Sequence, residues 1–111
     1  LTPMIRGILA TCSTVPASLP GGNEEIQRVI ADYYAGDPLF HVQEDLPQTK
    51  SVAGSDRTLL SARYDDRTGA VTVFAAIDNL GKGAAGQAVQ NFNIMHGLPE
   101  TTGLELEGRW P

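Results

Sequence analysis

The chain has 111 residues, of which 41% are hydrophobic and 19% charged, a composition that excludes a disordered segment and fits a small globular domain. Its formal net charge of −5 argues against nucleic acid or an anionic membrane surface as a partner. No apolar run approaches the roughly 20 residues of a membrane-spanning helix, and a single cysteine, which rules out an internal disulfide, fits a reducing, cytoplasmic setting.

The first half of the chain predicts a strand, a helix and two short extended segments. Met4 to Val15 is typical of a strand, with Arg6-Gly7 as a kink or a close approach near its start. Asn23 is a suitable N-cap for a helix that presents one apolar stripe. Short strands are expected over residues 39–42 and 50–53. The helical stripe consists of Ile26, Val29, Ile30 and Tyr33.

The second half predicts a β-hairpin followed by a helix. Thr58–Tyr64 and Ala70–Ile77 are the two strands, and Gly69 provides a positive φ angle in their connection. A last helix is expected from about Gly83 to His96, with Ala85, Ala88, Val89, Phe92 and Met95 on one face. This order of elements predicts an α+β fold, with a mainly antiparallel sheet and helices packed on one face.

The strongest candidate for a ligand site is the turn between the last strand and the last helix. Asn79 stands at the end of the strand, ahead of Gly83, Ala84 and Gly86. A helix N-terminus with small residues offers free N–H groups to an anion or a polar cofactor ring. The spacing matches neither a Walker A loop nor a dinucleotide fingerprint in its usual context. The glycines could therefore serve turn geometry alone, and Asn79 could simply form an Asx turn.

The remaining chemically active side chains are few. Arg6 could clamp a carboxylate or an acyl phosphate through its guanidinium, or could form a surface ion pair. Cys12 is expected to be a small apolar residue in a core strand rather than a nucleophile. His41 and His96 are assigned to neither catalysis nor metal binding, because the two histidines and one cysteine match no zinc spacing.

Several stretches of the chain also carry a family resemblance. Residues 78–91 read Asp-Asn-Leu-Gly-Lys-Gly-Ala-Ala-Gly-Gln-Ala-Val-Gln-Asn, and residues 97–104 read Gly-Leu-Pro-Glu-Thr-Thr-Gly-Leu. Together with residues 3–11 and 47–55, they resemble the C-terminal end of the N-acetyl-gamma-glutamyl-phosphate reductases, the NADPH-dependent semialdehyde dehydrogenases of arginine biosynthesis. The first part of residues 78–91 is also similar to aspartate-semialdehyde dehydrogenases, but the rest favours the arginine enzymes.

The resemblance implies a fold like the C-terminal domain of glyceraldehyde-3-phosphate dehydrogenase. Residues 1–82 would belong to a substrate and dimerisation domain, and residues 83–111 would form a helix and tail that pack on an NADP-binding domain outside this chain. The resemblance also implies a homo-oligomer, either a dimer or a tetramer. Because the chain begins at Leu1 and at once enters a strand-like run, we expect a fragment that starts within a domain.

The resemblance further implies roles for individual residues. Asn79 would contact the nicotinamide carboxamide of NADPH, with Gly83, Ala84 and Gly86 as a floor of small residues. In the resembled reaction a cysteine thiolate attacks the acyl phosphate, phosphate leaves and NADPH delivers hydride. The family's cysteine and histidine motifs do not occur here, so we expect no catalytic residue in this chain and no activity from the chain alone.

Two alternatives remain at this point. The first is another semialdehyde dehydrogenase, acting on an aspartyl or aminoadipyl phosphate. The second is a dimerisation module that has no part in catalysis. The sequence also departs from the resembled pattern at Asp56, which stands where Asn is usual, so that a ligand contact from this position is in doubt because a carboxylate cannot donate a hydrogen bond.

Overall fold

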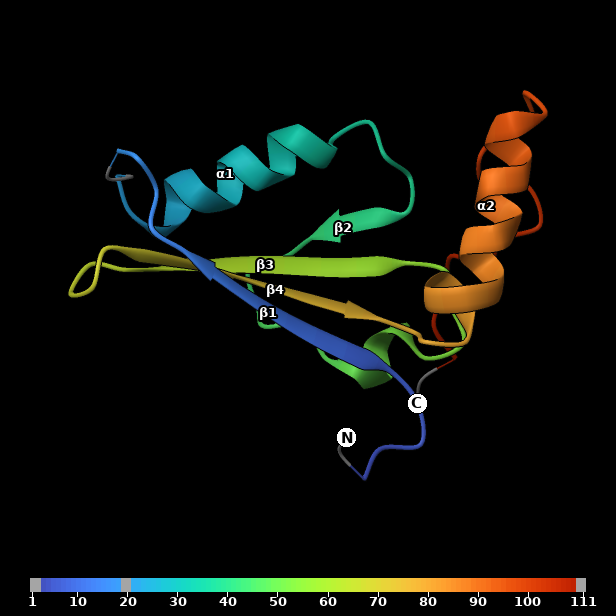
Figure 1. Ribbon diagram of the computed structural model, residues 1–111, viewed down its shortest axis with the longest axis horizontal. Helices are drawn as coiled ribbons and strands as arrows, with labels where there is room; N and C mark the ends of the chain where they lie inside the picture. The colour runs from blue at the N-terminus through green and yellow to red at the C-terminus, as the bar shows by residue number, and fades with distance from the viewer. Residues whose placement is uncertain (1–2, 19–20, 110–111) are drawn as a thin grey trace.

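A computed structural model of the chain describes residues 3–18 and 21–109. It contains a four-stranded sheet and two α-helices (Figure 1). In chain order the elements are β1 (Ile8–Thr14), α1 (Asn23–Tyr34), β2 (Phe40–Val42), the 3₁₀ turn η1 (Thr49–Val52), β3 (Thr58–Asp65), β4 (Ala70–Ile77), the π-helical turn η2 (Gly81–Ala85) and α2 (Gly86–Met95).

The sheet has the strand order β1-β4-β3-β2. β4 pairs antiparallel with both β1 and β3, whereas the short edge strand β2 runs parallel to β3. The predicted α+β class and the mainly antiparallel sheet are therefore confirmed. The parallel pair exists because residues 43–57, which include η1, carry the chain back along the sheet between the end of β2 and the start of β3.

The predicted hairpin between β3 and β4 is also confirmed. Gly69 adopts a φ angle of +71° and donates its N–H to the carbonyl of Asp65 over 2.8 Å. The Asp65 carboxylate accepts from the backbone N–H of Arg67 at 3.0 Å and from the hydroxyl of Thr68 at 2.8 Å. Local turn chemistry thus sets the register of the two longest strands.

Helix α1 covers one face of the sheet over β2 and β3 (Figure 1). Tyr34 stacks on Phe40 with 4.4 Å between the ring centroids. The predicted apolar stripe is only partly covered, since Val29 is 55% and Tyr33 81% exposed. Asn23 does not cap the helix as predicted; it is the first helical residue, and its Oδ1 accepts the backbone N–H of Tyr64 at 2.7 Å.

The opposite face of the sheet carries η1 and the loops beside it. Residues 50–53 were predicted to be extended, and this prediction is wrong, because Thr49–Val52 forms a 3₁₀ turn. The turn directs Val52, which has no exposed surface, into a core cluster with Leu59 and Ala76. A strand at this position would point alternate side chains away from that core.

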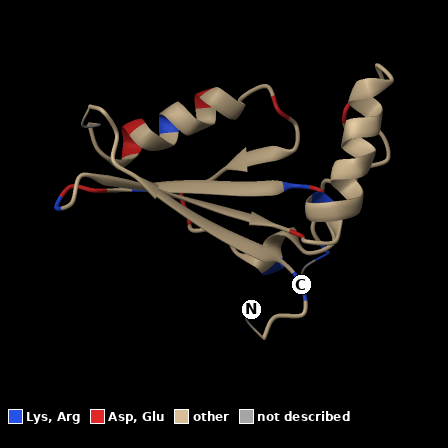
Figure 2. Cartoon of the chain, viewed as in Figure 1, with Lys and Arg blue, Asp and Glu red and all other residues tan. Residues whose placement is uncertain are grey.

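Strand β1 forms an edge of the sheet, and all seven of its residues are exposed. Neither β1 nor β4 contains a charged residue, so charges gather on α1, at the hairpin tip and around the end of the sheet near α2 (Figure 2). Cys12, predicted to lie in the core, is exposed instead. The reason is that none of the described residues covers this part of β1.

Helix α2 stands beyond the end of β4 rather than over the sheet (Figure 1), which corrects the expectation that both helices pack on one face. It ends as predicted at Gly97, whose φ angle is +66°. The N–H groups of Gly97 and Leu98 donate to the carbonyls of Ile94 and Asn93, at 3.2 and 2.9 Å, as in a Schellman motif.

The buried face of α2 carries Gly86, Gln90 and Asn93. The apolar stripe lies on the other side of the helix and is exposed, with Phe92 at 55% and Met95 at 81%. The side-chain amide of Asn93 donates to the carbonyls of Glu100 and Thr102 at 3.0 and 2.9 Å. The polar face therefore packs on the chain's own C-terminal segment, and the apolar face is left open to solvent.

Candidate functional site

The end of β4 meets the segment that precedes β1, and the junction is built around Asp78. Its side chain has no exposed surface. The Arg6 Nε atom lies 2.8 Å from Oδ1 and 2.7 Å from Oδ2 of this carboxylate. The backbone N–H of Leu80 donates to Oδ1 at 2.9 Å, and that of Gly54 donates to Oδ2. One carboxylate thereby joins three segments that lie far apart in sequence.

These contacts determine the ionisation of Asp78. Burial alone raises the pKa of a carboxyl group, because it removes water from the charged form. The hydrogen bonds from Arg6 and from the backbone N–H groups of Gly54, Leu80 and Gly81 outweigh burial, and they lower the pKa of Asp78 from 3.8 to about 2. Asp78 is therefore an anion at neutral pH, paired with the guanidinium of Arg6.

Asn79 forms the second link between β4 and the start of β1. Its Oδ1 accepts the backbone N–H of Gly7 at 2.6 Å. Gly7 has a φ angle of +106°, and a Cβ added to it would lie 2.6 Å from Cβ of Thr49, so the expected kink and close approach are both present. Within the described residues no group accepts a hydrogen bond from the Nδ2 of Asn79, so this donor is unpaired.

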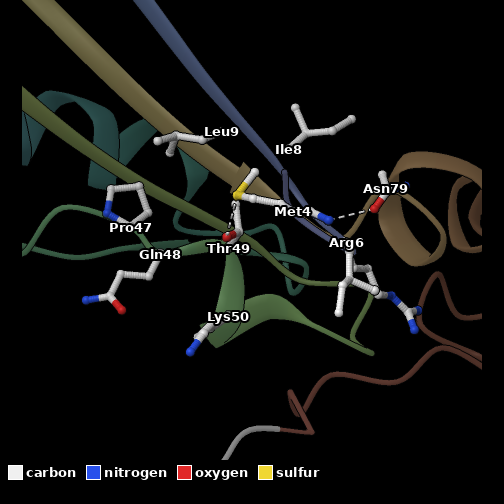
Figure 3. Close-up of a pocket in the computed structure, with 11 residues that line it drawn as sticks. Met4, Arg6, Ile8, Leu9, Pro47, Gln48, Thr49, Lys50 and Asn79 are labelled. Carbon is white, nitrogen blue, oxygen red and sulfur yellow. Dashed lines mark hydrogen bonds between the residues drawn. The ribbon is translucent and has the colours of Figure 1, made fainter. Parts of the chain in front are cut away.

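Arg6 and Asn79 line the same hollow, which has a volume of about 940 Å³ and is open to solvent (Figure 3). Its other walls come from the segment that enters β1 and from the residues that lead into η1. In Figure 3 the Asn79 amide points toward the backbone beside Arg6, whose guanidinium extends toward the C-terminal segment. The hollow is lined by Met4, Ile5, Arg6, Gly7, Ile8, Leu9, Pro47, Gln48, Thr49, Lys50 and Asn79.

The glycine-rich turn lies outside this hollow. Gly83 and Ala84 are exposed, whereas Gly86 is buried. A Cβ added to Gly86 would lie 1.7 Å from Oδ1 of Asp56, so the absence of a side chain at residue 86 is explained by that carboxylate. Asp56 in turn accepts the backbone N–H of Glu105 through Oδ2 at 2.9 Å. The structure thus brings Arg6 and Asn79 together, but it does not place Gly86 beside them.

A buried polar network beside α2 was missed by the sequence analysis. Lys82 is 8% exposed, donates to Oε1 of Gln90 and lies with its Nζ 5.5 Å from the centroid of the Phe40 ring. Gln90 in turn donates to Glu100. Burial lowers the pKa of Lys82, an effect that the nearby carboxylates of Asp37, Glu100 and Asp56 oppose. The spacing of Gly86, Gln90 and Asn93 was a signal of a second, polar face on the helix.

Asp78 was also not identified by the sequence analysis as the residue that joins these segments. The Asx turn proposed for Asn79 is made by its neighbour, since Asp78 Oδ1 accepts the N–H two residues ahead. His41 and His96 are both exposed and do not line the hollow. Among residues 3–18 and 21–109 no group of three or more His, Cys, Asp or Glu side chains is placed to hold a metal ion.

None of the helices that the structure describes combines the length and the apolar character needed to cross a bilayer.

Comparison with known proteins assigns this arrangement to a family. The sequence profile of the family described as "Semialdehyde dehydrogenase, dimerisation domain" matches residues 1–79. Proteins named N-acetyl-gamma-glutamyl-phosphate reductase align with the whole chain, at 50% identity in Thermus thermophilus, 53% in Desulforudis audaxviator and 51% in Pelotomaculum thermopropionicum. The chain covers 32% of the length of each of these relatives.

The profile ends at Asn79, so it covers the sheet, α1 and both residues that link β4 to the segment before β1. The alignment with the reductases continues through α2 and the C-terminal segment. The fold, the profile and the relatives therefore agree, and the chain belongs to the semialdehyde dehydrogenase dimerisation-domain family.

Proposed function

We propose that this chain is part of an NADPH-dependent reductase that converts N-acetyl-gamma-glutamyl phosphate to N-acetylglutamate 5-semialdehyde and phosphate, in arginine biosynthesis. The observation that carries this proposal is the roughly 50% identity, over the whole chain, to reductases of that name. The chain spans about a third of the length of these relatives. We propose that the cysteine nucleophile and the catalytic histidine are supplied by sequence outside this chain.

The geometry supports roles for two residues of the hollow. The free Nδ2 of Asn79 can donate to the carboxamide oxygen of the nicotinamide, while its Oδ1 stays on Gly7. Arg6 is held to Asp78 through Nε, so its two terminal amino groups are free to bind a carboxylate or phosphate of the substrate. Bound NADPH would supply the hydride. The exposed backbone of Gly83 and Ala84 would border the nicotinamide, with Gly86 behind them as the packing partner of Asp56.

Replacing Asn79 with Asp in the full-length protein is expected to raise the KM for NADPH about fivefold to tenfold. The substitution retains an acceptor for the Gly7 N–H but removes the donor, and a lost hydrogen bond of this kind costs about 1 kcal/mol. NADPH oxidation at 340 nm measures the effect. A dimerisation module without a catalytic part predicts no change in NADPH affinity for either Asn79→Asp or Asn79→Ala.

The substrate is tested with the same assay. The full-length protein should turn over N-acetyl-gamma-glutamyl phosphate faster than aspartyl or aminoadipyl phosphate, and a reversed order would favour the other semialdehyde dehydrogenases. The isolated 111-residue chain should show no turnover with any of the three. Activity from the isolated chain would show that its own residues include a nucleophile. It would overturn the proposal that the nucleophile and the catalytic histidine are supplied by sequence outside this chain.

The apolar face of α2 supports a proposal about domain organisation. We propose that residues 1–82 form part of a substrate and dimerisation domain and that α2 docks its exposed apolar stripe on the NADP-binding domain of the same protein. Phe92 is 55% and Met95 81% exposed, although both follow the helical spacing of a packed face. An exposed apolar stripe of this kind marks a surface that packs against another element. The sequence that could provide that element is available, because about two thirds of the length of the relatives lies outside this chain.

Replacing Phe92 with Gln should weaken association of this chain with the separately produced NADP-binding portion about tenfold or more. The buried aromatic area would be lost, whereas the α2 backbone and its polar inner face would be unchanged. Sedimentation velocity of the mixed components measures the association. Gln87→Ala, a change at a polar residue of the same helix that contacts Asn91, serves as the matched control and should bind as the wild type does.

A further inference from the structure

We propose that Asp78 is a positioning residue, which holds Arg6 and Asn79 in a common geometry so that substrate and cofactor bind next to each other at the end of β4. The inference rests on the function proposed above. Asp78 does not line the hollow and has no exposed surface, so it touches neither ligand directly. Its effect must pass through the two residues that do line it.

Side-chain contacts replace backbone pairing at the end of the β1–β4 ladder. The last backbone pair is Ile8 with Ile77. Beyond it, the chain leaves the ladder at Gly7, where φ is +106°, and side chains replace backbone pairing. Asn79 accepts from the Gly7 N–H, and Asp78 accepts from Arg6. Arg6 is therefore joined to Asp78, and Gly7 to Asn79. These two links restrict the backbone of both segments beside the hollow.

Asp78 holds Arg6 by one side of its guanidinium group. Only Nε of Arg6 is used, at 2.8 Å from Oδ1 and 2.7 Å from Oδ2 of Asp78, and the arginine side chain is 40% exposed. Among the described residues none accepts from the terminal amino groups of Arg6. A guanidinium anchored in this way keeps its two outer N–H groups parallel and directed away from the anchor, which is the geometry that binds a carboxylate or phosphate through two hydrogen bonds.

The contacts of residue 78 require a carboxylate rather than an amide. A neutral Asn at residue 78 could accept the N–H groups of Leu80 and Gly81 and so form the same turn. It could not accept simultaneously from Arg6 and from the Gly54 N–H, because its Nδ2 is a donor. Burying a charge is costly unless it is fully paired. The paired charge therefore serves the link to Arg6 and to residue 54, beyond the needs of the turn.

The test uses the full-length enzyme with Asp78→Asn. Positioning through both residues predicts that the KM for the acyl phosphate and the dissociation constant for NADPH each rise about fivefold or more. NADPH binding is followed by its fluorescence, which needs no turnover. Val52→Ala is the matched control. Val52 is fully buried in the core cluster with Leu59 and Ala76, and its apolar side chain takes no part in the hydrogen bonds that hold Arg6 and Asn79. A purely structural Asp78 predicts that both variants lose active protein while both constants stay unchanged, and that outcome would overturn the inference.

A second variant keeps Asp78 intact, and it decides the question if Asp78→Asn does not fold. Arg6→Ala should raise the KM for the acyl phosphate, and millimolar ethylguanidine should restore it, because the Asp78 carboxylate would hold the added guanidinium in place. Methylamine, a single-point donor, should not restore it. Failure of ethylguanidine to restore the KM would show that Asp78 does not position the cation.

The two proposals fail in different ways. A wild-type enzyme that reduces aspartyl phosphate instead would overturn the proposed substrate, and the same measurements with that acyl phosphate would still test Asp78. A wild-type protein that neither binds NADPH nor reduces any acyl phosphate would overturn both the function and the positioning role.

Discussion

Replacing Gly86 with alanine is expected to destabilise the folded protein by about 2 kcal/mol or more, although alanine is the better helix former. In an unobstructed helix the change would stabilise by about 1 kcal/mol. Here the new methyl group would lie 1.7 Å from Oδ1 and 2.6 Å from Cγ of Asp56, and 3.0 Å from the carbonyl carbon of Gly81. The steric conflict therefore outweighs the gain in helix propensity.

The carboxylate of Asp56 cannot move away without loss, because its Oδ2 accepts the N–H of Glu105. Urea unfolding of the full-length protein, monitored by circular dichroism, measures the change in the free energy of unfolding. Gly36→Ala is the matched control, since a Cβ there meets nothing within 4 Å, and it should alter stability by less than about 0.5 kcal/mol. Asp56→Gly should recover part of the loss when combined with Gly86→Ala. A Gly86→Ala protein as stable as the wild type would contradict the packing described here.

Acidification is expected to remove about 2 kcal/mol of stability through Asp78. Its pKa is about 2 in the folded protein, against 3.8 for the free group, so folding is favoured by the ionised form. The unfolded chain binds the proton first. The contribution is therefore fully present above about pH 4.5, falls as the pH decreases through 3.8 and is lost when the pH reaches about 2.

Asp78→Asn isolates this contribution, because the amide does not titrate. At pH 7 the variant should be less stable than the wild type by about 2 to 3 kcal/mol, since Arg6 and the Gly54 N–H lose their acceptor. The difference between the two proteins should shrink steadily as the pH is lowered from 4.5 toward 2, as measured by urea unfolding. A constant difference across this range would show that the carboxylate does not carry the stabilisation.

Local sequence patterns predicted much of the fold. The hairpin of β3 and β4, the presence of α1 and the end of α2 at Gly97 all depend on residues within a few positions of one another. The position of Asn79 at a strand end, its family resemblance and the guanidinium chemistry of Arg6 placed these two residues among the site residues, and the structure brings both of them to one hollow. The role that each plays toward a ligand remains a prediction.

The errors share a physical cause, which is that they depend on partners remote in sequence. The helical spacing of Phe92 and Met95 identified an apolar face correctly, but spacing does not say which element covers it, and here the described residues do not. Cys12 was expected in a core because strands are often covered on both faces, whereas β1 is a bare edge. The link from Asp78 to Arg6 spans 72 positions, and no local pattern in the sequence reveals such a pair.

The same separation has a consequence for the time course of folding. The β3–β4 hairpin closes a short loop. In contrast, β1 cannot pair until β4 is available, because β4 is the strand next to it in the sheet of the described residues. Contacts between distant segments form late because loop closure costs entropy before any pairing compensates for it. During synthesis β1 therefore leaves the ribosome before β4 and stays without its pairing strand until β4 has emerged. The exposed, uncharged edge strand is the part of this chain most in need of protection from premature association while the protein is being made.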